Sequence, residues 1–116
     1  MFKVDTTEQH FADNYQKLFS SVDDVPFLEI PLGWIPLFSH CCDRIQQQEI
    51  PTDFRFLQVK EKMSALRIYT VNYTSEIEDI VREFETLSRR TCMKCSYEAA
   101  RYRHRQKLVL CDYCVR

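Results

Sequence analysis

Two pairs of cysteines, each with two residues between its members, constrain this chain more than any other feature. Cys92 and Cys95 form the first pair, Cys111 and Cys114 form the second, and residues 96–110 connect them. A two-residue gap lets one tight turn present two sulfurs to the same ion, and two such pairs supply the four thiolates of a tetrahedral site. The spacing therefore predicts one structural zinc ion, Zn²⁺, bound by all four cysteines.

Other interpretations of these cysteines fit the sequence less well. Two disulfides would need an oxidising compartment, and the N-terminal segment, which carries Lys3, Asp5 and Glu8, does not resemble a secretory signal. A redox motif would need a strand–helix junction of the thioredoxin type, and His104 could replace one sulfur as a ligand. Because a catalytic zinc keeps one position open for water, four cysteines predict a closed, structural site. Since the N-terminal segment does not resemble a secretory signal, we expect a cytoplasmic protein.

The charge of the chain changes sign close to the first cysteine pair. Residues 1–88 hold 8 Lys and Arg against 15 Asp and Glu, whereas residues 89–116 hold 8 against 2, and the net charge of the 116 residues is −1. We expect an acidic α+β body over residues 1–90 and a basic zinc module over residues 91–116, joined in one compact unit. A hydrophobic content of 45% is sufficient for a core.

Hydrophobic periodicity predicts three helices in the body. They span residues 7–20, 34–48 and 76–90. The first and the third helix should begin with a capping box, in which two side chains three positions apart bind each other's backbone N–H groups. The paired residues are Thr6 with Gln9, and Ser75 with Glu78.

Two strand-like segments lie between the second and third helices. Residues 54–73 alternate in the manner of a β-hairpin, with a turn at residues 63–65, whereas residues 21–32 contain prolines and predict an irregular connection. Residues 97–110 predict a strand, a turn and a second strand within the zinc module. We therefore predict an α+β fold, with about three helices on a small antiparallel sheet and a zinc-ribbon-like C-terminal module.

The two remaining cysteines, Cys41 and Cys42, lie beside His40 and Asp43. This sequence invites a metal or nucleophile interpretation, but consecutive helical residues point about 100° apart and do not easily chelate one ion. Both cysteines also fall on the apolar face of the second predicted helix, where free cysteine packs as a small hydrophobe. We expect them in the core.

Basic residues alternate between the two cysteine pairs. Arg101, Arg103 and Arg105 would point to the same face of a strand, with Lys107 following, and such a row could neutralise phosphates. A solvated face, or a face that docks on the acidic body, explains the same pattern without a ligand. The row is our alternative candidate site, for nucleic acid.

Aromatic residues in the predicted hairpin permit two interpretations. Phe54, Phe56, Tyr69 and Tyr73 could form a platform on which bases stack, but such platforms normally carry a basic face and the body is acidic. We expect all four in the core.

Several segments together resemble a family of small bacteriophage and prophage proteins, mostly without assigned function. They are residues 33–37 (GWIPL), residues 58–62 (QVKEK), residues 66–69 (LRIY) and the paired cysteines. The resemblance covers roughly residues 33–116. This chain departs from the family at Ser64 and Ser96, where glycine is usual.

The resemblance implies a small accessory factor that binds and inhibits a host or competitor protein. The sequence carries no Ser-His-Asp arrangement, and Gly33, its only glycine, cannot form a Gly-rich phosphate loop. We therefore expect a non-enzymatic, zinc-stabilised factor with a protein partner. Nucleic-acid binding by the basic module is the alternative, and a redox-regulated zinc switch is a third interpretation.

Overall fold

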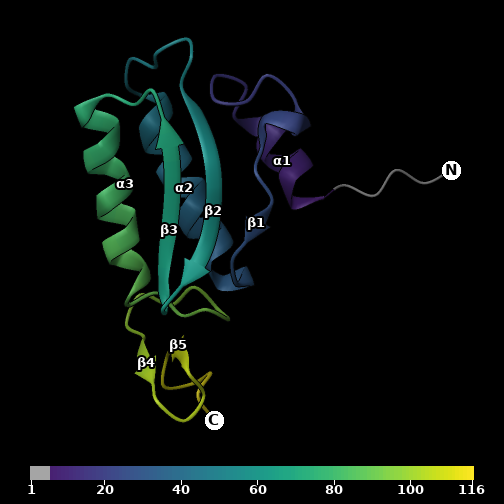
Figure 1. Ribbon diagram of the computed structural model, residues 1–116. Coiled ribbons are helices and arrows are strands. Elements are labelled where there is room, and N and C mark those ends of the chain that lie inside the picture. The colour runs from purple at the N-terminus through teal and green to yellow at the C-terminus, as the bar shows by residue number, and fades with distance from the viewer. Residues whose placement is uncertain (1–5) are drawn as a thin grey trace, which may run out of the picture.

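The computed structural model describes residues 6–116 and has the predicted α+β fold (Figure 1). The helices are α1 (Thr7–Asn14), α2 (Ile35–Gln46) and α3 (Ser75–Ser88), with short 3-10 turns at Val22–Asp24 and Leu32–Trp34. The strands are β1 (Leu28–Glu29), β2 (Arg55–Lys62), β3 (Ala65–Val71), β4 (Arg101–Arg103) and β5 (Leu108–Leu110). Strands β1, β2 and β3 form one sheet in that order, and β4 pairs with β5 in a second.

The predicted hairpin is confirmed and consists of antiparallel β2 and β3. Lys62 pairs with Ala65, so the loop contains only Met63 and Ser64. Their φ angles are 52° and 64°, the left-handed conformation that two-residue hairpin loops of type I′ require. Ser64 therefore adopts the conformation that favours glycine, and its backbone N–H is bound by the carboxylate of Glu61 at 2.8 Å.

A short strand lies where the sequence predicted an irregular connection, and that part of the prediction is wrong. Leu28 and Glu29 of β1 pair in parallel with Val59 and Lys60 of β2, so the sheet is mixed rather than antiparallel. The chain passes from β1 through α2 to β2, which is the crossover that parallel neighbours need. Two paired residues are too few to show the alternation of a strand.

Helix α1 ends earlier than predicted, at Asn14 instead of residue 20. The side-chain amide of Asn14 donates to the carbonyl of His10 at 2.8 Å, and this kind of bond competes with helix continuation. Thr6 caps the helix by accepting from the backbone N–H of Gln9 at 3.0 Å, but the side chain of Gln9 donates to Asp13 instead of completing the capping box.

Helix α3 begins one residue before the predicted start, and its N-cap is Thr74 rather than Ser75. The hydroxyl of Thr74 accepts from the backbone N–H of Ile77 at 3.2 Å. Helix α3 also binds the outer edge of β3. The hydroxyl of Ser88 and the carboxylate of Glu85 each accept a backbone N–H of that strand, those of Leu66 and Ile68, at 2.9 Å.

Helix α2 lies behind the main sheet and α3 runs along the edge of β3, and Figure 1 shows no helix in front of β2 and β3. Aromatic rings join the inner layer, because Phe38 of α2 contacts Phe11 of α1 and Phe56 of β2. One core of buried side chains extends from these rings to Met93 and Leu110 of the C-terminal segment. None of the helices within residues 6–116 has the length and apolar character needed to cross a membrane.

Candidate metal centre

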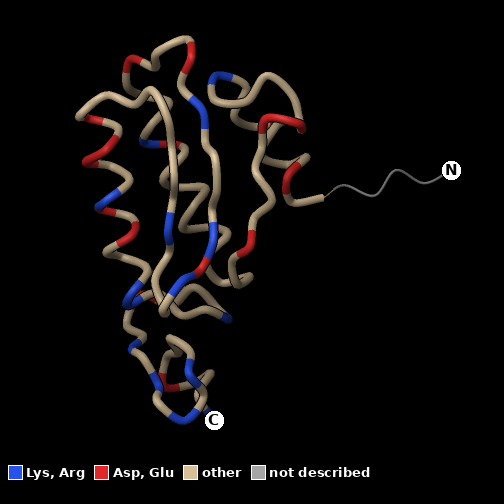
Figure 2. Tube along the Cα trace, in the orientation of Figure 1, with Lys and Arg blue, Asp and Glu red and all other residues tan. Residues whose placement is uncertain are grey.

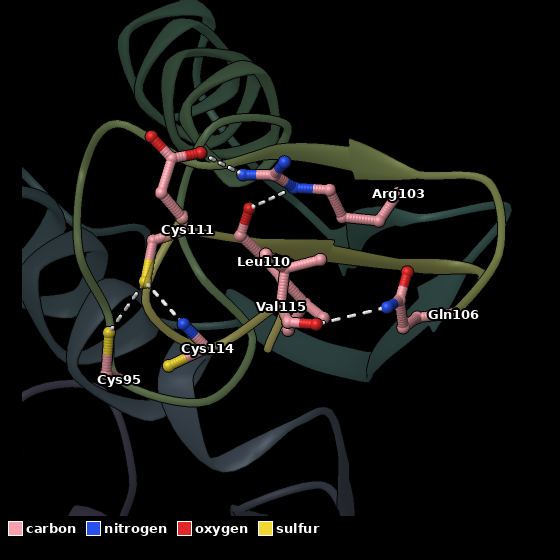
Figure 3. Close-up of polar contacts among 8 residues, drawn as sticks. Cys95, Arg103, Gln106, Leu110, Cys111, Cys114 and Val115 are labelled. Atoms are coloured by element: carbon pink, nitrogen blue, oxygen red, sulfur yellow. Dashed lines mark hydrogen bonds and ion pairs between the residues drawn. The ribbon is translucent and has the colours of Figure 1, made fainter.

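The four cysteines of the two pairs converge in the C-terminal module. The Sγ atoms of Cys92, Cys95, Cys111 and Cys114 all lie within 4.8 Å of one another. The sulfurs of Cys95 and Cys111 are 3.6 Å apart, and Figure 3 shows them facing each other, with the backbone N–H of Cys114 also donating to the sulfur of Cys111. This arrangement can hold one metal ion.

Each cysteine pair sits in a tight turn, or knuckle. In the first knuckle the N–H of Ser96 donates to the carbonyl of Cys92 at 3.0 Å, and in the second the N–H of Val115 donates to the carbonyl of Cys111 at 3.1 Å. Ser96 has a φ of 72°, the left-handed conformation that favours glycine. The serine is accommodated there because its hydroxyl donates to the carbonyl of Gly33 at 2.7 Å.

The predicted strand–turn–strand segment brings the two knuckles together. Strands β4 and β5 pair in antiparallel register, with Arg101 opposite Leu110 and Arg103 opposite Leu108. The backbone N–H of Met93, inside the first knuckle, donates to the carbonyl of Val109 on β5 at 2.9 Å. The first knuckle is therefore fixed to the strand that leads into the second.

The first knuckle also docks directly on the body, a contact that the sequence did not predict. The backbone N–H of Gly33 donates to the carbonyl of Met93 at 2.8 Å, and the indole N–H of Trp34 donates to the carbonyl of Thr91 at 2.9 Å. A Cβ atom at Gly33 would lie 2.2 Å from the carbonyl oxygen of Cys92. The sequence signal that could have indicated this contact was Gly33, the only glycine of the chain, which lies next to Trp34, the only tryptophan.

The environment of the sulfurs favours a bound cation. Burial would raise the pKa of the Cys92 thiol, but the backbone groups of Cys95, Cys111 and Lys94 outweigh it and lower the pKa to about 6. Burial and the neighbouring sulfurs raise the pKa of Cys114 to about 12. The sulfurs thus compete for negative charge, and a divalent cation removes this competition because it binds all of them as thiolates.

Cys41 and Cys42 lie apart from this cluster, on α2. Both side chains are fully buried among apolar neighbours, where the core interpretation places them. Burial raises the pKa of both thiols, so neither is a ready nucleophile. The neighbouring His40 and Asp43 approach each other at 3.8 Å on the exposed side of the helix.

The predicted row of arginines does not form. Arg103 donates to the carbonyl of Leu110 at 3.0 Å and to the carboxylate of Asp112 at 2.7 Å, and its side chain is only 12% exposed (Figure 3). The hydrogen bond and charge of Arg103 hold the pKa of Asp112 below its usual value. Arg105 lies beyond β4 in the turn, so alternation along a strand does not apply to it.

The other basic residues of the predicted row remain exposed. Arg101, Arg105 and Lys107 all face solvent, and Lys107 has a φ of 59° at the end of the turn, where its backbone N–H donates to the carbonyl of Arg103 at 2.7 Å. Three cations of the module are thus available to a partner, without the linear arrangement that the sequence predicted.

Comparison with known proteins identifies no relative of this chain. No protein-family model matches it, and neither a curated protein nor a solved structure does.

Proposed function

We propose that this protein is a non-enzymatic binding factor whose C-terminal module is held by one structural zinc ion. The observation that carries the proposal is the cluster of four sulfurs, all within 4.8 Å of one another. Four thiolates fill a tetrahedral zinc site, which leaves no position for a catalytic water or a substrate. The ion then serves to hold the fold.

Zinc is the ion that this donor set favours. Four thiolates in two C-x2-C knuckles are typical of structural Zn²⁺, whereas Mg²⁺ and Ca²⁺ prefer oxygen ligands. Structural zinc sites contribute about 10–16 kcal/mol of apparent binding free energy at neutral pH, which is available for folding. The hydrogen bonds from Gly33 and Trp34 to residues 91–93 extend this stabilisation to the body.

The proposed partner is a protein. Five large apolar side chains are strongly exposed, with exposed fractions of 61% to 82%. They are Phe27, Leu32, Met63, Tyr97 and Tyr113. Aromatic residues and Met are enriched at the centres of protein interfaces, and each knuckle carries one of the two tyrosines. The resemblance to phage proteins adds the expectation of an inhibitor that acts on a host or competitor protein in the cytoplasm.

The metal proposal is tested by metal analysis of the purified protein. We expect one zinc per chain, lost on dialysis against a chelator under denaturing conditions and regained on refolding with Zn²⁺. Cobalt in place of zinc should give the visible absorption of a tetrahedral thiolate site. A protein that folds to the same free energy of unfolding without any metal would contradict the proposal.

The partner proposal is tested by capture with the zinc-loaded protein, using wild type and a Tyr97→Ser/Tyr113→Ser variant in parallel. A specific protein partner should be retained by the wild type at a stoichiometric ratio and reduced at least tenfold by the variant. The purified partner must then bind in isolation. Equal capture by both proteins would exclude the knuckle tyrosines, and no stoichiometric protein at all would count against a protein partner.

The alternative function is nucleic-acid binding by the basic module. It is supported by the exposure of Arg101, Arg105 and Lys107 and weakened by the engagement of Arg103 with Asp112. Replacement of Arg101 and Arg105 by glutamate is the variant that tests it, and this variant also serves as a control below.

A further inference from the structure

The outer face of strands β2 and β3 is an open surface that the metal centre does not use. Its central positions are cross-strand neighbours, with Lys60 opposite Arg67 and Gln58 opposite Tyr69. On the other side of β2, Phe56 and Val59 are buried in the core. We call this surface the open sheet face and define it by its outward residues on the two strands, Gln58, Lys60, Lys62, Arg67 and Tyr69.

The open sheet face is basic although the body as a whole is acidic. Figure 2 shows Lys and Arg along β2 and β3, while acidic residues gather on α3 and the loops. The acidic residues of α3 are Glu76, Glu78, Asp79, Glu83 and Glu85. Two acidic residues border the face, Glu61, which binds the N–H of Ser64, and Glu29, which pairs with Lys60 in the β1–β2 register. The face has three cations, which outnumber these two acidic residues: Lys60, Lys62 and Arg67.

The pairing of Lys60 with Arg67 works against stability. Like charges directly opposite each other on antiparallel strands are destabilising, whereas opposite charges are stabilising. Of the ion pairs between the described residues, none includes either of these two side chains. A polyanion bound at this face would remove the repulsion.

The open sheet face also carries an exposed aromatic ring, that of Tyr69, which corrects one prediction from the sequence. Tyr69 and Tyr73 were expected in the core but are 41% and 49% exposed, whereas Phe54 and Phe56 are buried as predicted. The ammonium group of Lys60 lies 5.6 Å from the centre of the Tyr69 ring. Cation and ring therefore stand together on the uncovered surface.

We propose that the open sheet face binds single-stranded nucleic acid, with a base stacking on Tyr69 and phosphates contacting Lys60, Lys62 and Arg67. Unpaired bases can stack on exposed rings, and the combination of stacking rings with cations that follow the backbone is how sheets bind single strands. This site goes beyond the proposed function, because it adds a nucleic-acid partner on a surface separate from the knuckle tyrosines.

Fluorescence anisotropy of the zinc-loaded protein tests this site. The probes are labelled 12-nucleotide oligo(dT) and oligo(U), with a mixed-sequence duplex for comparison, titrated across a salt series. Each phosphate neutralised on a single strand contributes a slope of about −0.7 to the dependence of log Kobs on log salt. Three cations therefore predict a slope of about −2 for the single strands, which should bind more tightly than the duplex.

Variants separate the open sheet face from the basic module. Lys60→Glu/Arg67→Glu should weaken single-strand binding at least tenfold, and the matched charge change Arg101→Glu/Arg105→Glu should change it less than threefold. Tyr69→Ala should weaken binding about 5- to 140-fold at unchanged salt dependence, since stacking is uncharged. Tyr69→Phe should restore it. Zinc content and far-ultraviolet circular dichroism check each fold, and Lys60→Gln/Arg67→Gln replaces the charge reversal if that variant does not fold.

Three results would overturn the proposal. The first is a flat titration at low salt, and the second is duplex binding as tight as single-strand binding. The third is a greater loss from the module variant than from the sheet variant, which would place nucleic-acid binding on the module. None of these results affects capture of a protein partner by the knuckle tyrosines, so the two proposals fail independently.

Discussion

Replacement of Gly33 by alanine should separate the zinc module from the body. The backbone at Gly33 does not have a positive φ, so alanine meets no conformational strain there. In open space such a change would stabilise the protein by about 0.4–1 kcal/mol, because alanine restricts the unfolded chain. At this position the new Cβ would lie 2.2 Å from the oxygen of Cys92 and 2.5 Å from the carbonyl carbon of Met93. Because of this close contact, alanine should lower the free energy of unfolding at this position instead of raising it.

The size of the loss follows from the contacts that must move. Both clashing atoms belong to the backbone of the knuckle, so relief requires the knuckle to shift, and overpacking of this kind costs about 1–3 kcal/mol. The shift stretches the bonds from Gly33 to Met93 and from Ser96 to Gly33, each worth about 1 kcal/mol. We expect a loss of about 3–5 kcal/mol in the free energy of unfolding.

Urea unfolding of the zinc-loaded protein, followed by Trp34 fluorescence, measures this loss. Trp34 is the only tryptophan, it is fully buried, and its indole N–H binds the module. Ser96→Ala is the matched control, because it removes one of the same bonds without a clash and should cost about 1 kcal/mol. Gly33→Ala with a free energy of unfolding within about 0.5 kcal/mol of wild type would refute the close docking of the knuckle.

Three further predictions concern the metal ligands, the partly buried Arg103, and Asp24 in the 3-10 turn, whose carboxylate accepts from the backbone N–H of Ser20 at 2.8 Å. Cys114→Ser should reduce the number of zinc ions bound per chain, which metal analysis measures. Cys42→Ser should leave zinc binding complete but lower the free energy of unfolding in urea by about 1–3 kcal/mol, because it buries a hydroxyl. Arg103→Ala should destabilise the protein by about 1–3 kcal/mol in the same assay, through loss of a charged hydrogen bond, and a neutral result would contradict its structural role. Hydrogen bonds from Ser20 hold the pKa of Asp24 below its ordinary value of 3.8, so its titration midpoint measured by NMR should lie below 3.8. The stability that the ionised carboxylate adds should be present above pH 3.8 and lost as the pH falls through the midpoint. A midpoint at or above 3.8 would exclude the contact.

The sequence predicted the elements whose signals are local. Helices α2 and α3 carry continuous apolar faces, and the hairpin carries alternation, so each was placed to within a few residues. The N-cap of α3 was misplaced by one position because Thr74 and Ser75 offer the same hydroxyl chemistry. The early end of α1 depends on a side-chain bond of Asn14, which periodicity does not reveal, since Tyr15, Leu18 and Phe19 remain buried beyond the helix.

The features that the sequence did not predict depend on contacts between distant residues. The four sulfurs were found because ligand spacing is a local property, but the bond from Trp34 to Thr91 joins positions 57 residues apart. The net charge of the body concealed the basic sheet face, because the acidic residues of α3 and the loops offset the cations of β2 and β3 in the sum. Exposure of Tyr69 follows from the absence of a helix in front of β2 and β3.

The way α3 binds the edge of β3 has a consequence for self-association. An unpaired edge strand is a template on which further strands of other chains can add, and this is the usual start of aggregation. Here the donors of Leu66 and Ile68 are already bound by Ser88 and Glu85, and the opposite edge strand, β1, has two residues. The sheet therefore resists growth into fibrils at both edges while its open face stays accessible.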